Sequence, residues 1–396
     1  MIFSKKLAVR SGFVVQEAVN FGMKPLFTSL ISLFVIRWFS LELWGSFVFY
    51  LVFIQLSITF LSWGQKPHLT KLFAAQPGKI GSTWGTSFAA RLPLVLIVMC
   101  CILVFSKLQF YAIPLILWVT FKWLAVMLES LIQFNRDYIT AIKAELLSLA
   151  GSSLLFYFWL EEFDLELLIY IFFISNAIKC VALIPILLKN KVSILPLKGW
   201  KTELLASLPF FALTLAGMLQ TKGDLYLATF LMEEAELGKY QVLVGFLLLG
   251  QAFSGIVLGP FLKNIFRLKN NEISKFKKRY LMVGLIVSAL FSIALFLLMH
   301  YVYQIDLQIQ TAFLCFAYLA PLYFFTIETQ LLVKHQKEKM LLNFTLAATI
   351  VNVTLSVIFI PIIGITGALL SGFLGKVTLA ALVLQKTNKI QNVGIS

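Results

Sequence analysis

The chain has 396 residues, of which 60% are hydrophobic and only 13% are charged, and its formal net charge is +15 at pH 7. Soluble globular proteins carry about 25% charged residues, whereas here apolar runs of about 20 residues, each long enough to cross a bilayer as a helix, recur throughout the chain. These values exclude a soluble globular protein. They predict an all-α polytopic membrane protein without a separate soluble domain.

Apolar runs between charged breaks predict about twelve membrane-spanning helices. The first run contains Glu17, Asn20 and Lys24, so we expect a retained helix and not a cleaved signal peptide. The predicted spans begin near Gly12, Leu41, Thr83, Phe110, Tyr138, Leu165, Leu204, Leu237, Tyr280, Gln308, Met340 and Thr366.

The positive charges lie mainly in alternate loops. If the N-terminus is cytoplasmic, 23 Lys and Arg residues fall in cytoplasmic segments, three in external segments and seven within spans. This asymmetry is a strong positive-inside signal and predicts cytoplasmic N- and C-termini. The basic charge therefore reflects membrane topology and contact with anionic lipid, and we expect no nucleic-acid partner. The four cysteines fall within spans at spacings typical of neither a disulfide framework nor a metal site.

The two halves of the chain resemble each other. Trp44-Gly45 aligns with Leu237-Gly238 at an offset of 193 residues, and the segment 179–190 aligns with 376–387 at an offset of 197. Glu129 and Glu328 occupy matching places in the fourth and tenth spans. The pattern predicts two parallel, pseudo-symmetric six-helix lobes around a central cavity. We place the N-terminal lobe at 1–190, a cytoplasmic linker at 191–202 and the C-terminal lobe at 203–396.

The first span carries one polar stripe. Glu17, Asn20, Lys24 and Thr28 follow helical spacing and share a face. Lys24 lies near the bilayer midplane, where it cannot easily reach the interface, and Pro25 predicts a kink or hinge beside it. The stripe either lines a ligand path or forms a polar seam that holds helices together.

Other charges within spans leave two interpretations open. Such residues cost about 2.5–3.5 kcal/mol at the bilayer centre and usually face a bundle interior or a wet cavity, but those near helix ends can snorkel to the interface. Lys143 is expected to snorkel, and Lys179 and Lys376 either snorkel or pair with another helix. The remaining charged candidates for a cavity are Arg91, Lys122, Glu129 and Glu328.

The seventh predicted span contains the sequence KGD at positions 222–224. Lys222 and Asp224 are two residues apart, so they point to different sides of a regular helix and cannot pair with each other. Asp224 is expected either to line the cavity or to pair with a lysine from another helix. Lys222 would lie on the opposite side unless Gly223 acts as a hinge or breaks the helix.

Two stretches resemble bacterial polysaccharide (O-antigen, Wzx-type) flippases, within the superfamily that includes the MATE multidrug exporters. They are 37-RWFSLELWGSFVFYLVFIQL-56 and 220-QTKGDLYLATFLMEEAELGKYQVL-243; Gly223 departs from the family pattern, which has an apolar residue there. The resemblance implies an inner-membrane flippase that moves an undecaprenyl-diphosphate-linked oligosaccharide to the outer leaflet by alternating access. It also implies a cationic cavity lined by the first and seventh helices.

The expected site combines this resemblance with the intramembrane charges. Its substrate-binding cations are Lys24, Lys222, Arg91 and Lys122, and its ion-coupling or charge-pairing acids are Glu17, Asp224, Glu129 and Glu328. We expect no catalytic residue, metal or cofactor, but coupling to a proton or sodium gradient through Asp224 or Glu17 is expected. The expected partners are the lipid-linked oligosaccharide, anionic lipid and the polysaccharide polymerase machinery.

Two other functions stay open. A MATE-like multidrug or cation antiporter would use the buried carboxylates to hold a cation, although the excess of internal lysines disfavours a cationic substrate. A membrane-embedded glycan polymerase or ligase would need a large external loop or a carboxylate cluster at the membrane edge; here no external loop exceeds about ten residues and no Asp-x-Asp motif occurs.

Overall fold

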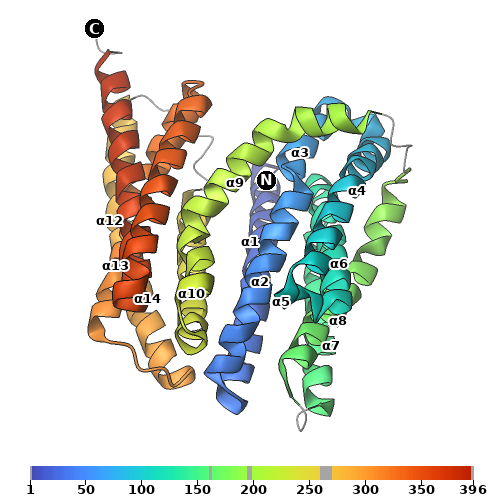
Figure 1. Ribbon diagram of the computed structural model, residues 1–396. Coiled ribbons are helices and arrows are strands. Elements are labelled where there is room, and N and C mark those ends of the chain that lie inside the picture. The colour runs from blue at the N-terminus through green and yellow to red at the C-terminus, as the bar shows by residue number, and fades with distance from the viewer. Residues whose placement is uncertain (1, 160–162, 194–198, 259–269, 394–396) are drawn as a thin grey trace. The chain divides into compact units, whose positions relative to one another are not determined.

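A computed structural model describes residues 2–159, 163–193, 199–258 and 270–393, and every regular element in these ranges is helical (Figure 1). The predicted all-α fold class is therefore confirmed. Inside the helices, the described side chains exclude those of residues 2–15, 17–18, 21, 24, 256–257, 270–271 and 388–393.

The helices follow one another with short connections. The first half of the chain contains α1 (Ile2–Trp38), α2 (Leu41–Ser62), α3 (Gln65–Ala75), η1 (Pro77–Lys79), α4 (Ile80–Val104), α5 (Ser106–Gln109), α6 (Ala112–Asn135), α7 (Tyr138–Phe158) and α8 (Leu165–Lys189). The second half contains α9 (Trp200–Leu231), α10 (Glu234–Leu258), α12 (Asn270–Leu297), the π-helical turn η3 (Leu298–Val302), α13 (Ile309–Lys334) and α14 (Glu338–Val393).

Nine helical stretches in the described ranges are long and apolar enough to cross a membrane. One of them, α14, contains a sharp turn at Ile363 and Gly364, where Gly364 has a φ of 52°. This turn divides α14 into the two spans predicted to begin near Met340 and Thr366. The spans predicted near Gly12 and Leu237 correspond to α1 and α10.

The chain forms two compact units. Unit 1 comprises Met1–Thr28 and Phe49–Leu215, and unit 2 comprises Ser29–Val48 and Ala216–Ser396. The division falls inside α1, α2 and α9, so three helices contribute residues to both units. The first half of α9 packs with unit 1, and the expected lobe boundaries at 190 and 203 stay predictions.

A reciprocal contact between α2 and α10 lies within unit 2. A Cβ atom added to Gly45 would collide with the backbone carbonyl of Glu234, and one added to Gly238 would collide with that of Leu41. The offset is 193 for both pairs, since 234 − 41 and 238 − 45 are equal. Gly45 thus contacts Glu234, the repeat counterpart of Leu41, while Gly238, the counterpart of Gly45, contacts Leu41 itself. Such an exchange of partners is expected at a two-fold axis. The weak sequence repeat thus has a physical cause in the close approach of two helix starts.

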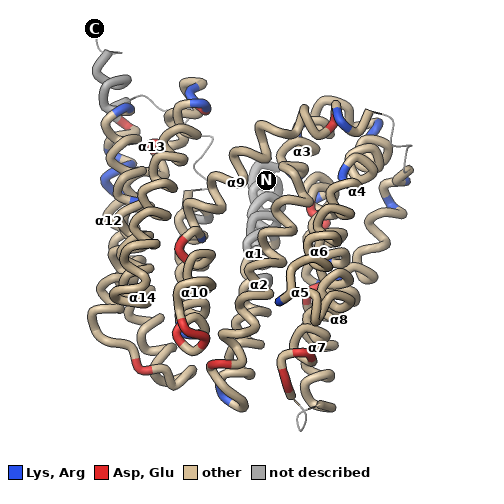
Figure 2. Tube along the Cα trace, in the orientation of Figure 1, with Lys and Arg blue, Asp and Glu red and all other residues tan. Residues whose placement is uncertain are grey.

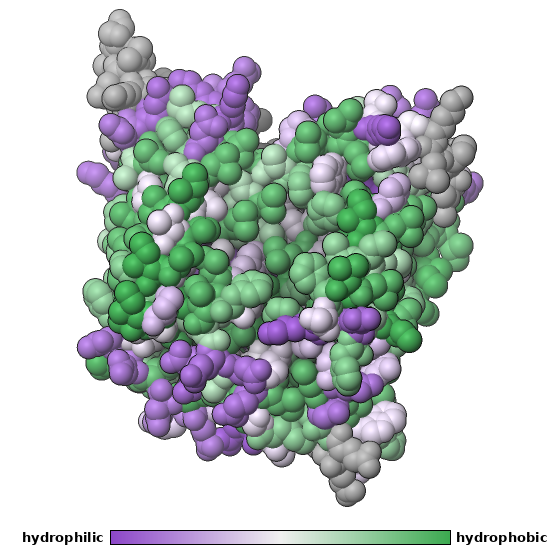
Figure 3. All heavy atoms as spheres, in the orientation of Figure 1, coloured by the Kyte–Doolittle hydropathy of each residue, from purple (hydrophilic) through white to green (hydrophobic). Residues whose placement is uncertain are grey.

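Charge and hydropathy are distributed as in a membrane protein. In each unit, Lys and Arg gather near one end of the helices; Asp and Glu occur at both ends and along the helices, with clusters at the end opposite the basic one (Figure 2). Between these hydrophilic ends, the visible sides of the helices are covered by apolar side chains (Figure 3). Exposed residues such as Leu96, Phe313 and Ile350 would be costly in water but suit a hydrocarbon environment.

Candidate functional site

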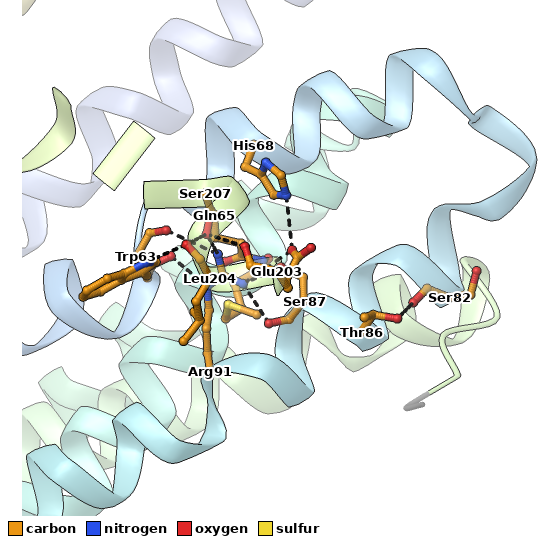
Figure 4. A network of polar contacts seen from close by, with 12 residues as sticks. Trp63, Gln65, His68, Ser82, Thr86, Ser87, Arg91, Glu203, Leu204 and Ser207 are labelled. Carbon is orange, nitrogen blue, oxygen red and sulfur yellow. Dashed lines mark hydrogen bonds and ion pairs between the residues drawn. The ribbon is translucent and has the colours of Figure 1, made fainter. Parts of the chain in front are cut away.

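Arg91 lies at the centre of a polar network in unit 1 (Figure 4). Its side chain is fully buried and donates hydrogen bonds to the carbonyl oxygens of Ser62, Trp63 and Ser87 at 2.8–3.3 Å. It also donates to the hydroxyl oxygens of Ser87 at 2.6 Å and Ser207 at 3.3 Å. These contacts join the end of α2 to α4 and α9, and they use the guanidinium as a structural crosslink.

Glu203 supplies the negative charge of this network. Its Oε1 atom lies 3.9 Å from Arg91 Nη1 and 3.3 Å from His68 Nε2. Trp63 adds a hydrogen bond from its indole nitrogen to the Leu204 carbonyl oxygen at 3.1 Å and stacks on Phe211 with ring centroids 4.1 Å apart. The network and the stacked rings hold the first half of α9 in unit 1. In this structure Arg91 is engaged with protein groups, and its expected role in a cavity stays a prediction.

A charged pocket opens elsewhere in unit 1. Its polar lining comes from five helices: Asn20 on α1, Lys66 on α3, Glu129 and Gln133 on α6, Tyr138 and Glu145 on α7, and Lys179 on α8. Lys179 pairs with Glu145, and Lys66 pairs with Glu129 at 3.1 Å. The two acids balance the two lysines, so the charged side chains that line this pocket carry no net charge. Asn20, from the predicted polar stripe, lies in the pocket lining and so faces other protein.

The repeat-related glutamates Glu129 and Glu328 have equivalent partners. Glu129 on α6 binds Lys66, and Glu328 on α13 binds Lys277 on α12 at 2.6 Å. In each half of the chain, the lysine lies before the third predicted span of that half, and the glutamate lies in the fourth. Their geometry therefore fits the charge-pairing role expected for both glutamates.

The two pairs differ in burial, which gives a matched comparison. The side chains of Lys277 and Glu328 are 21% and 4% exposed, whereas those of Lys66 and Glu129 are 50% and 21% exposed. We expect Lys66→Gln to lower the free energy of unfolding by less than about 1 kcal/mol. Lys277→Gln should lower it by about 1.5 kcal/mol, because it leaves a more deeply buried carboxylate without its donor. Thermal unfolding of the two detergent-solubilised variants compares them, and a larger loss for Lys66→Gln would contradict this ranking.

Asp224 lies at the centre of a buried polar cluster in unit 2, which we call the Asp224 cluster: Asp224, Tyr240, Tyr318 and Lys376. The Asp224 side chain is completely buried, and its Oδ2 atom accepts hydrogen bonds from the hydroxyls of Tyr240 at 2.8 Å and Tyr318 at 3.5 Å. Lys376, on the second stretch of α14, is also completely buried and interacts electrostatically with Asp224. Of the two roles expected for Asp224, the nearby charge of Lys376 fits pairing with a lysine from another helix, although no hydrogen bond joins the two side chains.

Sequence reasoning identified only part of this cluster. Lys376 was considered for snorkelling or interhelical pairing but was not included among the site residues. Tyr240 lies within the stretch 220–243 that carries the family resemblance but was not named as a site residue, and Tyr318 was missed. The sequence signal that could have identified Lys376 is its alignment with Lys179 in the repeat. Each of these two lysines lies near an acidic residue of its own unit. Nothing in the apolar sequence around Tyr318 marks that tyrosine as a partner of Asp224.

Lys222 lies on the opposite side of α9 from Asp224, as the helical spacing predicts. The helix continues through Gly223, so a break that would turn Lys222 is absent from this structure. A Cβ atom at Gly223 would make ordinary contacts with Val353 and Asn352. Lys222 is partly exposed, and no hydrogen bond, ion pair or ring contact joins it to another residue in the described part of the chain. In this it differs from Arg91 and Lys376, whose side chains are completely buried.

The remaining expected residues fall into two groups. The side chains of Glu17 and Lys24 lie outside the described residues, so their roles stay predictions. Lys122 Nζ lies 5.7 Å from the centroid of the Trp118 ring in unit 1. Pro25 lies inside α1, three residues before the point at which this helix passes from unit 1 to unit 2.

No protein-family model and no curated protein matches the chain, but solved structures match its fold. The lipid II flippase MurJ, in an inward closed conformation, has a TM-score of 0.74 at 15% identity over 95% of this chain and 87% of that chain. The MATE multidrug transporter DinF-BH has a TM-score of 0.61 at 16% identity over 98% of this chain and 96% of that chain.

An inward-facing multidrug-resistance MATE family transporter of the MOP superfamily has a TM-score of 0.59 at 12% identity over 96% of this chain and 94% of that chain. The chain therefore shares the helical fold of these membrane transporters. The fold expected from the resemblance is confirmed, and the flippase MurJ and the drug transporters have it in common.

Proposed function

We propose that this protein is a flippase that moves an undecaprenyl-diphosphate-linked oligosaccharide from the inner to the outer leaflet of a bacterial inner membrane. The observation that carries the proposal is Lys222. This lysine is about eleven residues from the end of its predicted span, is partly exposed and has no partner among the described residues. An ammonium group held at this depth is costly unless it meets an anion.

The chemistry of the cargo explains the need for such a group. A diphosphate linked to a sugar is anionic and strongly hydrated, so it cannot cross hydrocarbon unaided. A lysine in its path lowers the barrier by pairing with phosphate oxygens, while the polyprenyl tail stays in lipid. The match to the fold of MurJ, a lipid II flippase, supports a lipid-linked substrate.

The same proposal includes the membrane setting and the energy source. Basic residues at one end of the helices would face the cytoplasm together with both termini and contact anionic lipid. The glycan would leave toward the machinery that polymerises surface polysaccharide. Transport would be coupled to a proton or sodium gradient through Asp224, with alternating access provided by movement of the two lobes.

The second candidate is a MATE-like multidrug or cation antiporter, because MATE transporters share the fold. A buried carboxylate that receives a cationic drug would have to be open to it. Asp224 instead receives hydrogen bonds from two tyrosines and lies near Lys376. The cluster therefore favours the flippase.

Replacing Lys222 with glutamine tests the proposal in cells. We expect about a tenfold or greater loss of surface glycan at equal protein level, because one charge-assisted bond contributes about 1.5–3 kcal/mol. The matched control is Lys143→Gln, which removes an exposed lysine near the end of its predicted span and should leave surface glycan unchanged. In the Lys222→Gln strain, a lipid-linked glycan should accumulate on the cytoplasmic side. Normal surface glycan in this variant would contradict the role of Lys222.

A further inference from the structure

The ammonium nitrogen of Lys376 occupies an unusual position. The residue is completely buried, yet its Nζ atom has no hydrogen-bond partner in the described part of the chain. It lies 2.9 Å from the centroid of the Tyr318 ring. The ring face and the charge of Asp224 therefore replace the water that would otherwise surround the ammonium.

Tyr318 connects the two charges of the Asp224 cluster. Its ring faces Lys376, and its hydroxyl lies 3.5 Å from Asp224 Oδ2 and 3.3 Å from the Thr221 carbonyl oxygen. Tyr240 donates to the same carboxylate oxygen at 2.8 Å. The carboxylate therefore has hydrogen-bond donors of its own, while the ammonium of Lys376 has no acceptor among the described residues. Becoming neutral would therefore cost Lys376 fewer favourable interactions than it would cost Asp224.

The charge balance of the cluster limits it to one exchangeable proton. The pair of Asp224 and Lys376 has no net charge when it holds one exchangeable proton. Gaining a second proton or losing the first would leave one uncompensated charge in a dry core. The other titratable groups facing the cluster are the phenols of Tyr226, Tyr240 and Tyr318 and the thiol of Cys315. None of these is charged near neutral pH under ordinary conditions. A change in proton content therefore requires contact with water.

The cluster also contains its own cation. The described residues include no group of three or more His, Cys, Asp or Glu side chains able to hold a metal ion. A sodium ion beside Asp224 would have to share the cluster with the Lys376 ammonium, and like charges in a dry core repel strongly. The composition of the cluster thus favours a proton over a metal cation.

We propose that the Asp224 cluster is a proton-binding site in which Lys376 takes the place of a metal cation, and that it releases and regains one proton in each transport cycle. The inference rests on the proposed transport function and specifies its coupling ion. When the cluster opens to water, a Lys376 N–H bond breaks and the proton passes to a water molecule, which becomes hydronium. Asp224 remains a carboxylate held by the two tyrosines. On the other side of the membrane, a hydronium ion returns a proton to the lysine nitrogen, and no electrons are transferred.

The first test measures cation binding without any glycan. The thermal midpoint of the full-length protein in detergent is compared in sodium chloride and in N-methylglucamine chloride, for wild type, Lys376→Met and Lys376→Met/Asp224→Asn. We expect no sodium effect on wild type, a rise of about 3 °C or more for Lys376→Met, whose vacated carboxylate can bind sodium, and no effect on the double variant. Sodium stabilisation of wild type, or no response of a folded Lys376→Met, would overturn the proposal.

A second test keeps the proposal falsifiable if Lys376→Met does not fold. Protein carrying ¹³C-labelled lysine gives one NMR signal per resolved lysine, and Lys376→Arg, which keeps the positive charge, identifies the signal of Lys376 by its loss. We expect that signal to change between the ammonium and amine positions within the pH range over which the protein stays folded. A Lys376 signal that stays at the ammonium position throughout would overturn the proposal. Neither test involves the cargo, so the coupling site and the flippase function can fail separately.

Discussion

Replacing Gly45 with alanine should lower the free energy of unfolding by about 3 kcal/mol or more, which is at the upper end for overpacking. The added methyl group would collide with the backbone carbonyl of Glu234, where α2 approaches α10 within unit 2. A backbone carbonyl cannot rotate away as a side chain can, so the two helices would have to separate. Thermal unfolding of the detergent-solubilised protein measures the loss.

Gly217→Ala provides a matched control for this prediction. Gly217 also lies inside a helix of unit 2, but a Cβ atom there would meet nothing within 4 Å. Its replacement by alanine should be neutral or slightly stabilising, since alanine has the higher helix propensity. Equal stability losses at Gly45 and Gly217 would refute the close approach of α2 and α10.

Replacing Arg91 with methionine should be the most damaging single change in unit 1, at about 3–5 kcal/mol. The substitution fills similar volume but leaves Glu203 without its nearby guanidinium. It also removes the donor to the carbonyl oxygens of Ser62 and Trp63. Protein yield and thermal midpoint in detergent measure the effect.

The double variant Arg91→Met/Glu203→Gln distinguishes a buried charge from lost packing. It should recover part of the stability, because the unbalanced carboxylate is removed together with the arginine. Lys143→Met is the matched control, since Lys143 is exposed, and its effect should stay within about 0.5 kcal/mol. A loss as large for Lys143→Met as for Arg91→Met would show that the Arg91 network contributes little.

The helical architecture could be predicted from the sequence because it depends on short-range properties. Runs of about 20 apolar residues can cross a bilayer only as hydrogen-bonded helices. The repeat that aligned Gly45 with Gly238 also proved meaningful, since the two glycines lie at one reciprocal contact. The division into units was harder to predict, because it depends on where the first half of α9 packs and not on where loops occur.

The candidate site was predicted less completely, and the reason is again physical. The spacing of Lys222 and Asp224 on one helix correctly separated their directions, because helical geometry is local. The partners of Asp224 come from α10, α13 and α14, up to 152 residues away, since 376 − 224 is 152. Tyrosines are common in apolar spans, so only the packed structure distinguishes Tyr240 and Tyr318 from others. Arg91 likewise satisfies its charge with backbone carbonyls, which no sequence pattern reveals.

The most direct measurement of the central claim is transport in vesicles that contain only the purified protein. A labelled undecaprenyl-diphosphate oligosaccharide is placed in one leaflet, and its appearance in the other is followed with a lectin that cannot cross the membrane. Wild-type protein should transfer the glycan, and Lys222→Gln should transfer it about tenfold more slowly at equal protein content. Absence of glycan transfer by wild-type protein, together with gradient-driven transport of a cationic dye, would contradict the flippase function and favour the antiporter.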